Sequence, residues 1–433
     1  MRDRIDIPPV WLPGPLLPLA RRAVHALLSR IDQGTLHVDE GGRRTTFRGA
    51  APGPVAVVRV LDPRGWGRVA LRGTVGFGEA YIAGDFEADD LVALVRLMIQ
   101  NAGVMDHAER GLARLSGPLH RLRHRLRDNT LRGSRANIAA HYDLGNDFYA
   151  LWLDPTLSYS CAIFERPEAT LEEASLAKIA RTCAKLRLEP RHHLLEIGTG
   201  WGALAIHAAR VHGCRVTTTT ISRAQHEVAL ARVREAGLED RVTCLLRDYR
   251  ELTGTYDRLV SVEMVEAVGA ARLPAFFRAL ERRLAPDGLA LLQAITIREQ
   301  AWARSLREVD FVKRWVFPGS DLLSLQAISA ALAGQTSMSL IHLEDLTPHY
   351  ARTLAAWRER FLARLDAVRA LGYGPRFVRL WDFYLAYCQA GFAEGYVRDV
   401  QVLLAKPGHA ADPPLGALDP IAAAQAPIDL LAV

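Results

Sequence analysis

One short stretch gives the clearest indication of the fold of this chain: Leu194-Leu195-Glu196-Ile197-Gly198-Thr199-Gly200-Trp201-Gly202. An apolar strand runs into glycines at every second position, and a helix is predicted from Gly202 to about Val211. Glycine adopts positive φ angles without strain and lets a ligand approach the backbone closely. In open α/β sheets, ligands lie at the carboxyl ends of the strands. The stretch therefore predicts a strand, a glycine loop and a helix that together hold a ligand.

Strands and helices continue to alternate after this loop. The pattern predicts helices over 222–236 and 271–284, and strands over 215–220, 242–246, 258–262 and 289–295. Such alternation is typical of a doubly wound, mostly parallel sheet. We therefore expect an α/β, Rossmann-like domain, followed by a mainly helical last third with aromatic-rich stretches at 311–317 and 377–392.

The spacing of the loop favours S-adenosylmethionine over a dinucleotide. The glycines follow a GxGxG pattern, whereas the dinucleotide fingerprint is GxGxxG. Glu196 lies two residues before the first glycine, where it can orient the loop and the amino group of a methionine moiety. Dinucleotide enzymes use similar loops, and an ordinary strand-turn-helix has the same pattern. The loop alone leaves these alternatives open.

Two later segments are candidates for the ribose and adenine of this cofactor. The second strand ends in threonines and is followed by Ser222 and Gln225, so that hydroxyls and an amide stand where many such folds have an acid. Threonine-rich strands also arise from β-propensity alone. Asp248 and Tyr249 follow the third strand and can offer adenine a hydrogen bond and a ring face.

Composition excludes several classes of protein. A chain of 433 residues suggests about two or three domains. Its five cysteines form no CxxC pair, so we expect no disulfide framework and no metal site. Prolines interrupt the N-terminal apolar stretch, which argues against a signal peptide, and no apolar run reaches membrane-spanning length. The sequence thus predicts a cytoplasmic protein.

Residues 109–135 are strongly basic. The segment contains eight arginines and only two acidic residues, and leucines are interleaved among the arginines. A basic, partly amphipathic helix suits an anionic membrane surface, although a solvated arginine-rich linker has the same composition. The aromatic residues that stack on bases are missing from this segment, so we expect no nucleic-acid partner.

The chain divides into four predicted parts. Residues 1–108 form an N-terminal domain, with strand-like alternation at 55–61 and 68–72 and a helix over 89–101. The other parts are a basic linker helix at 109–135, a cofactor-binding domain at 136–405 and a tail at 406–433.

Six ordered blocks of sequence carry a family resemblance. They are HYDLGNDFY at 141–149, LSYSCAIF at 157–164, the glycine loop, VEMVE at 262–266, FVKRWVFPG at 311–319 and WDFYLAYC at 381–388. Together the blocks resemble the cyclopropane-fatty-acid synthases and the related mycolic-acid and fatty-acid C-methyltransferases. The resemblance covers about residues 135–400 and is looser at the N-terminus, where GEAY at 78–81 and Gly84-Asp85 match.

The resemblance implies a class I S-adenosylmethionine-dependent methyltransferase domain with a helical cover over an acyl pocket, and a smaller α+β N-terminal domain that handles lipid. It implies that the cofactor is held by Tyr159, Ser160, Gly198, Gly200, Trp201, Thr220, Gln225, Asp248 and Tyr249. From the loop pattern and the strand ends, we add Glu196, Gly202 and Ser222 to this set.

The resemblance also implies a bicarbonate ion that acts as the base. Its ligands would be Cys161, Glu266, Tyr350 and the backbone of Ile295. The family usually has a histidine as the remaining ligand, and this chain has Gln293 there. Glutamine can donate a hydrogen bond to an anion, but it cannot relay a proton as histidine can. The departure affects the base step and leaves the methyl-transfer step intact.

The implied function is C-methylation of cis double bonds in unsaturated phospholipid acyl chains, through a carbocation, to give cyclopropane chains. Two alternatives use the same cofactor: methylene- or methyl-branched acyl products, and N-methylation of a small amine. A third is a non-catalytic lipid-binding protein. The leading prediction makes the protein a homodimer that associates peripherally with the inner face of the membrane.

Overall fold

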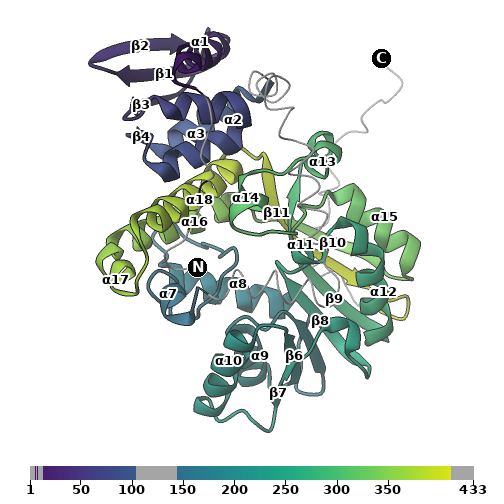
Figure 1. Cartoon of the computed structure of the whole chain (residues 1–433). Helices are drawn as coiled ribbons and strands as arrows, with labels where there is room; N and C mark the ends of the chain where they lie inside the picture. The colour runs from purple at the N-terminus through teal and green to yellow at the C-terminus, as the bar shows by residue number, and fades with distance from the viewer. Residues whose placement is uncertain (1–4, 6, 8–12, 104–143, 411–433) are drawn as a thin grey trace, which may run out of the picture.

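The computed structural model describes residues 5, 7, 13–103 and 144–410 (Figure 1). A seven-stranded sheet with the strand order β10-β11-β9-β8-β5-β6-β7 organises the larger part of the chain. Its strands are β5 (His193–Ile197), β6 (Arg215–Thr220), β7 (Val242–Leu246), β8 (Tyr256–Val262), β9 (Leu284–Ile297), β10 (Ser339–Asp345) and β11 (Val397–Ala405).

The first five of these strands are parallel, which confirms the predicted doubly wound α/β class. β11 and β10 extend the sheet in antiparallel fashion beside β9. The last third of the chain is mainly helical, as predicted, but the sequence reading did not predict the strands β10 and β11. Asp399 and Gln401 interrupt the apolar run of β11, and both are fully buried.

Helices cover both faces of the sheet because alternate strand residues point to opposite sides. On one face, Leu194 packs with apolar residues of α8 (Leu171–Lys185), α9 (Ala203–His212) and α10 (Arg223–Glu235). On the other face, Leu195 packs with α12 (Leu273–Arg283) and α15 (Leu325–Gln335). Strands buried on both faces explain the continuous apolar run that precedes the glycine loop.

Short elements connect these layers. They are α7 (Asn146–Ala150), η3 (Tyr249–Glu251), α11 (Val265–Val268), η4 (Ala270–Arg272), α13 (Glu299–Ser305), α14 (Phe311–Trp315) and α17 (Leu365–Ala370). Two longer helices, α16 (Thr347–Ala363) and α18 (Pro375–Ala393), pack against each other beside the sheet.

The N-terminal region has its own four-stranded sheet with the order β2-β1-β3-β4. Its elements are η1 (Gly14–Leu16), α1 (Leu17–Leu28), β1 (Gln33–Glu40), β2 (Arg43–Arg48), β3 (Ala51–Val60), α2 (Arg64–Ala83), β4 (Phe86–Ala88) and α3 (Leu91–Gln100). The strand predicted at 55–61 and the helix predicted at 89–101 correspond to β3 and α3.

The strand-like pattern at 68–72 was wrong, because these residues belong to α2. Five residues are too few to separate a two-residue period from a helical one. The longer spacing of the buried residues Trp66, Phe77 and Ala80 fits a helix, which is kinked at Gly73.

α18 joins the N-terminal region to the larger sheet domain, and Figure 1 shows it running beneath α2 and α3. Arg379 donates hydrogen bonds to the carbonyl oxygens of Tyr81 and Phe86, 2.5 Å away in each case. The Tyr81 hydroxyl donates to Asp382 at 2.7 Å. These contacts fix the N-terminal region on the helices that flank the sheet.

Two predicted segments cannot be compared with the structure. The basic segment 109–135 and residues 411–433 of the predicted tail lie outside the described residues. Within the described residues, no helix has the length and apolar character needed to cross a membrane.

Candidate active site

The glycine loop between β5 and α9 has the backbone geometry that its sequence predicts. Gly198, Gly200 and Gly202 have φ angles of 106°, 52° and 89°. A Cβ atom at Gly200 would meet nothing within 4 Å, so the conformation, rather than lack of space, requires glycine there. The amides of Gly198 and Thr199 donate to the Thr219 carbonyl, which ties the loop to the end of β6.

A cleft of about 1190 Å³, a volume that includes open solvent at its mouth, lies over this loop. Ten of the twelve predicted cofactor residues line it: Tyr159, Ser160, Glu196, Gly198, Gly200, Trp201, Thr220, Gln225, Asp248 and Tyr249. Gly202 and Ser222 are not among the lining residues. They begin the helices that follow, and the Ser222 hydroxyl accepts a hydrogen bond from the Gln225 amide at the start of α10.

Glu196 is buried at the base of the loop. One of its carboxylate oxygens accepts a 2.5 Å hydrogen bond from the Thr218 hydroxyl, which also reaches Thr199. Burial raises the pKa of Glu196 to about 8, against the lowering effects of Thr218 and Lys178. A bound ammonium group would favour the ionised form of Glu196, so the residue suits the predicted contact with the methionine amino group.

The other cofactor candidates are held firmly in place. Arg250 makes a two-pronged contact with Asp248, at 2.8 and 2.7 Å. The Thr220 hydroxyl is 3.2 Å from the amide oxygen of Gln225. The Trp201 indole donates to Asn146 at 2.8 Å, which fixes the ring at the loop. Such pre-organisation lowers the cost of ordering the site when a ligand binds.

A second cluster of polar groups lies beside the cleft and centres on Glu263. The residue directly follows β8, lines the cleft and has a φ angle of 47°. Its Oε1 atom accepts hydrogen bonds from the Cys161 amide at 2.7 Å and from the Gln293 side-chain amide at 2.8 Å. Its Oε2 atom accepts one from the Tyr350 hydroxyl at 2.6 Å. Three predicted catalytic residues thus meet on a carboxylate that the sequence reading had not selected.

Gln293 is fully buried and held on both sides of its amide. Its NH₂ group donates to Glu263 and to Asp399, each at 2.8 Å. Its carbonyl oxygen accepts from Gln401 at 3.1 Å. The prediction that Gln293 holds bicarbonate through its NH₂ group does not fit, because both hydrogens are already shared with carboxylates of the chain.

Glu266 and Ile295 form a pair next to this cluster. The Ile295 amide donates to Oε1 of Glu266, whereas Oε2 is buried without a hydrogen-bond partner among the described residues. Burial, together with the nearby Glu263, raises the pKa of Glu266 to about 8. The backbone donor expected for bicarbonate is therefore also used by a carboxylate. As a set, these residues do not fit a bound bicarbonate ion.

Lys178 is a buried cation within the same region. Its ammonium group donates to the Ser160 hydroxyl at 2.8 Å. Burial lowers the pKa of Lys178, while its interactions with Glu263, Cys161 and Asp399 raise it. The lysine supplies positive charge where buried acids gather, and charged groups this deep are seldom found without such a partner.

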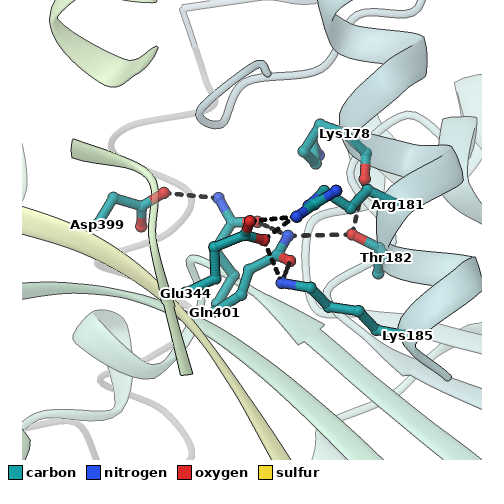
Figure 2. Close-up of polar contacts among 8 residues, drawn as sticks. Lys178, Arg181, Thr182, Lys185, Glu344, Asp399 and Gln401 are labelled. Atoms are coloured by element: carbon teal, nitrogen blue, oxygen red, sulfur yellow. Dashed lines mark hydrogen bonds and ion pairs between the residues drawn. The ribbon is translucent and has the colours of Figure 1, made fainter. Parts of the chain in front are cut away.

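Figure 2 shows the polar network around Lys185, Gln401 and Glu344, which continues toward Asp399. Lys185 donates to the amide oxygen of Gln401 at 2.7 Å and contacts Glu344. Gln401 also donates to the Thr182 hydroxyl, and Arg181 pairs with Glu344. The network leads from the partly exposed Arg181–Glu344 pair to the buried amide groups of β9 and β11.

Sequence reasoning missed Glu263, Lys178 and Asp399. Glu263 was within the VEMVE block and directly follows a predicted strand, the position that carries sites in this fold class. Lys178 occupies the buried stripe of α8 with Ile179 and Thr182, so a lysine on an apolar helical face was the available signal. Asp399 had no comparable signal, because its strand was not predicted.

Aromatic side chains surround the cluster. The Tyr159 and Tyr384 hydroxyls are 2.8 Å apart, and both rings belong to the aromatic core around α16 and α18. Tyr350 stacks on Phe392 with ring centroids 4.3 Å apart. Trp315 and Phe317 pack against the same core. The polar cluster is thus set in a largely apolar, π-rich environment.

Comparison with known proteins agrees with this geometry. Residues 129–402 match the family model of mycolic acid cyclopropane synthetase. The tuberculostearic acid methyltransferase UfaA1 of Mycobacterium tuberculosis is 38% identical over 349 residues, which are 79% of this chain and 81% of the relative. The cyclopropane-fatty-acyl-phospholipid synthase of Escherichia coli K12 is 35% identical over 362 residues, with 82% and 88% covered.

The solved structures agree as well. The mycolic acid cyclopropane synthase CmaA1, complexed with SAH and CTAB, superposes with a TM-score of 0.59 at 33% identity. That match covers 63% of this chain and 98% of the neighbour. The chain therefore belongs to the mycolic acid cyclopropane synthetase family of S-adenosylmethionine-dependent methyltransferases.

Proposed function

We propose that this enzyme methylates a cis double bond in an unsaturated phospholipid acyl chain and closes the product to a cyclopropane ring. One observation carries the proposal: the cofactor cleft adjoins the half-buried carboxylate of Glu263, which is held by three hydrogen bonds. An amine nucleophile attacks with its own lone pair, whereas an alkene leaves a cation that must later lose a proton from carbon. A dry, acceptor-lined site suits the second reaction.

S-adenosylmethionine supplies a methyl group on a positively charged sulfur. The alkene π electrons form the new carbon–carbon bond, and the carbon–sulfur pair stays on sulfur. The loop around Gly198 and Gly200 and the buried Glu196 hold the cofactor in the orientation that this in-line attack needs. The methyl-transfer step asks the protein mainly for positioning and for exclusion of water.

The carbocation is stabilised by the walls of the site. We assign this role to Tyr350, Tyr384, Trp315 and Phe317, because ring faces attract cations most strongly when water is excluded. Removal of a proton from the new methyl group then lets its C–H pair close the ring.

Membrane association is part of the same proposal. Residues 1–108 would take part in lipid handling, the basic segment 109–135 would bind the anionic inner face of the membrane, and the helices around α18 would cover the acyl chain. Basic groups near such a surface contribute about 1 kcal/mol each. The proposed assembly is a homodimer.

A branched acyl product is the second candidate, and the position of the base decides between the two. Loss of a proton from a neighbouring chain carbon gives a methyl-branched alkene. A hydride shift along the chain, followed by loss of a proton from the new methyl group, gives a methylene branch. The glutamine at position 293 favours this candidate, because it stands where the family resemblance places a histidine and contacts Glu263 beside the cleft. The name of the relative UfaA1, a tuberculostearic acid methyltransferase, points the same way.

Isotope labelling tests both candidates. The purified chain is incubated with deuteromethyl S-adenosylmethionine and vesicles of unsaturated phospholipid, and the acyl chains are analysed by mass spectrometry. A cyclopropane retains two of the three deuterons and shows no double bond. A branched product is identified by the position of its methyl or methylene carbon. Label found only on an added amine would overturn acyl methylation.

A further inference from the structure

We propose that Glu263 is the base that deprotonates the carbocation, so that a side chain of the protein replaces the bicarbonate ion implied by the family resemblance. The inference rests on the proposed function, since it assigns a role within that reaction. The donors expected to hold bicarbonate already hold a carboxylate of the chain.

Three hydrogen-bond donors form a cradle around Glu263, and their arrangement supports the replacement of bicarbonate by a side chain. Cys161, Gln293 and Tyr350 all direct hydrogen-bond donors at the two oxygens of Glu263. Bicarbonate and a carboxylate share the same planar O–C–O group, so one set of donors can hold either of them. Glu263 occupies the cradle as a covalently attached anion, with no binding equilibrium.

The backbone at Glu263 shows that this position is maintained at a cost. A φ angle of 47° lies in the left-handed region, where residues other than glycine are uncommon. Such strained residues are concentrated at functional sites. The backbone amide of Glu263 donates to the backbone carbonyl oxygen of Gln293 at 2.9 Å, which holds the strained residue beside β9.

A chain of donors fixes which side of Gln293 faces Glu263. An ammonium group has no acceptor, so the Gln401 atom that contacts Lys185 must be the carbonyl oxygen. The NH₂ group of Gln401 then faces the carbonyl of Gln293, and the NH₂ group of Gln293 faces Glu263. The labelled Lys185, Gln401 and Asp399 of Figure 2 mark the course of this chain. The side chain of glutamine does not titrate, so its NH₂ group is a donor at every pH. Such a residue suits an anionic partner.

Glu263, Glu266 and Asp399 compete for the negative charge, and their hydrogen bonds distinguish them. Glu263 accepts three, whereas Glu266 accepts one and has a buried oxygen without a partner among the described residues. Asp399 likewise has a buried oxygen without such a partner. Burial raises the pKa of all three, and the donors and Lys178 lower that of Glu263. Of the three, Glu263 alone lines the cofactor cleft.

The charges around Glu263 come from several elements. Lys178 on α8 faces it as a cation, and Glu266 and Asp399 face it as acids. Cys161, Tyr350 and Tyr384 are neutral near pH 7, because burial raises the pKa of each well above its ordinary value. One lysine offsets one carboxylate, so the most strongly hydrogen-bonded acid retains the charge.

The proton step balances without an external co-reactant. Oε2 of Glu263 accepts one hydrogen bond from the described residues, from Tyr350, and has a further lone pair for a proton. The C–H bond of the new methyl group breaks, and its electron pair forms the last bond of the ring. The proton passes to Oε2, and the neutral acid later releases it to solvent.

The test uses the full chain, deuteromethyl S-adenosylmethionine and unsaturated phospholipid vesicles in buffer stripped of carbon dioxide. Added bicarbonate is the variable for the wild-type chain. Glu263→Gln removes the base while nearly keeping its shape. Glu263→Gly removes the side chain and relieves the left-handed strain, which leaves space for an added anion. Glu281→Gln is the matched control, since Glu281 contacts Lys406 and Ser337 and does not line the cleft.

We expect the wild-type rate to be the same with and without bicarbonate. Glu263→Gln should lower acyl-chain methylation by at least about a hundredfold, the usual contribution of a general base. Bicarbonate or formate should restore at least about a tenth of the lost rate in Glu263→Gly and none in Glu263→Gln, which still fills the space.

Three results would overturn the assignment: dependence of the wild-type chain on bicarbonate, full activity of Glu263→Gln, or a Glu263→Gly variant that folds but is not rescued by either anion. Binding of S-adenosylmethionine by calorimetry shows that each variant is folded. If the wild-type chain labels no lipid at all, the proposed function fails. If it labels lipid but does not depend on Glu263, only the present inference fails.

Discussion

The two ends of the cleft are built in different ways. The cofactor end is a continuous loop whose glycine φ angles set the backbone that meets the ligand. The base end is a meeting of side chains from separate segments, held in a network that continues to Lys185 and Glu344. One substitution of a glycine at the cofactor end changes the backbone that meets the ligand, so cofactor binding is lost at once. At the base end, each substitution removes one contact, so the activity falls by a part each time. Substitutions at the two ends should therefore differ in both size and kind.

Gly198→Val should have the largest effect. A β-branched residue at a φ of 106° must move the loop out of its position under the cofactor. We expect S-adenosylmethionine binding to weaken at least about a hundredfold, with activity lost in parallel. Calorimetry measures the binding.

Gly213→Ala is the control for backbone strain. Gly213 also has a positive φ, of 66°, but it ends α9 away from the cleft. Its substitution should lower the melting temperature and leave cofactor affinity unchanged. Equal losses of affinity in both variants would mean that the loop acts only through stability.

Lys178→Met should have the next largest effect, at the base end. Removal of the cation raises the pKa of Glu263, because the lysine stabilises its ionised form. We expect kcat to fall by about ten- to a hundredfold near neutral pH, with the acidic limb of the rate profile moving to higher pH. A uniform loss at every pH would contradict the electrostatic role. The rate profile with saturating cofactor is the measurement.

Tyr350→Phe should also lower kcat and raise the pKa of Glu263, but by less than Lys178→Met. It removes one of three hydrogen bonds to Glu263. A hydrogen bond to a charged group contributes about 1.5–3 kcal/mol, so we expect about a tenfold loss of kcat and a smaller upward shift of the acidic limb. Cys161→Ser is the matched control, because its backbone amide still donates. A larger loss in Cys161→Ser than in Tyr350→Phe would contradict this cradle.

Glu266→Gln should change the free energy of unfolding and leave the cleft intact. The folded-state pKa of about 8 is above the ordinary value of 4.5, so folding favours the protonated acid. This acid therefore lowers the free energy of unfolding as the pH rises through that interval. Glutamine mimics the neutral acid and should raise the melting temperature at about pH 8 relative to wild type, with little change at about pH 4. Thermal denaturation at both pH values decides the sign.

The same difference between the two ends explains what could be read from the sequence. The loop from Leu194 to Gly202 is local, and its spacing predicted strand, turn, helix and ligand class together. Ten of twelve predicted cofactor residues line one cleft. The parallel strands were also predicted, because each is a short apolar run between helices.

The base end could not be assembled in this way. Glu263 and Gln293 meet through the pairing of β8 with β9, whereas Cys161 comes from the segment before α8 and Tyr350 from α16. Asp399, which also contacts Gln293, lies on β11, a strand that was assigned to a helical region. The resemblance supplied the donors but took their anion to be a bound ion. Because hydrogen bonds between distant segments leave no periodic pattern, Glu263 was recognised only from the distances to its three donors.

The most direct test follows the fate of the methyl group in the absence of bicarbonate. The purified chain, deuteromethyl S-adenosylmethionine and unsaturated phospholipid vesicles are combined in carbon-dioxide-free buffer, and the acyl chains are examined by mass spectrometry. We expect acyl chains that have gained one labelled carbon, at a rate that added bicarbonate does not change. Acyl chains without deuterium, or deuterium that enters only when bicarbonate is supplied, would contradict this expectation.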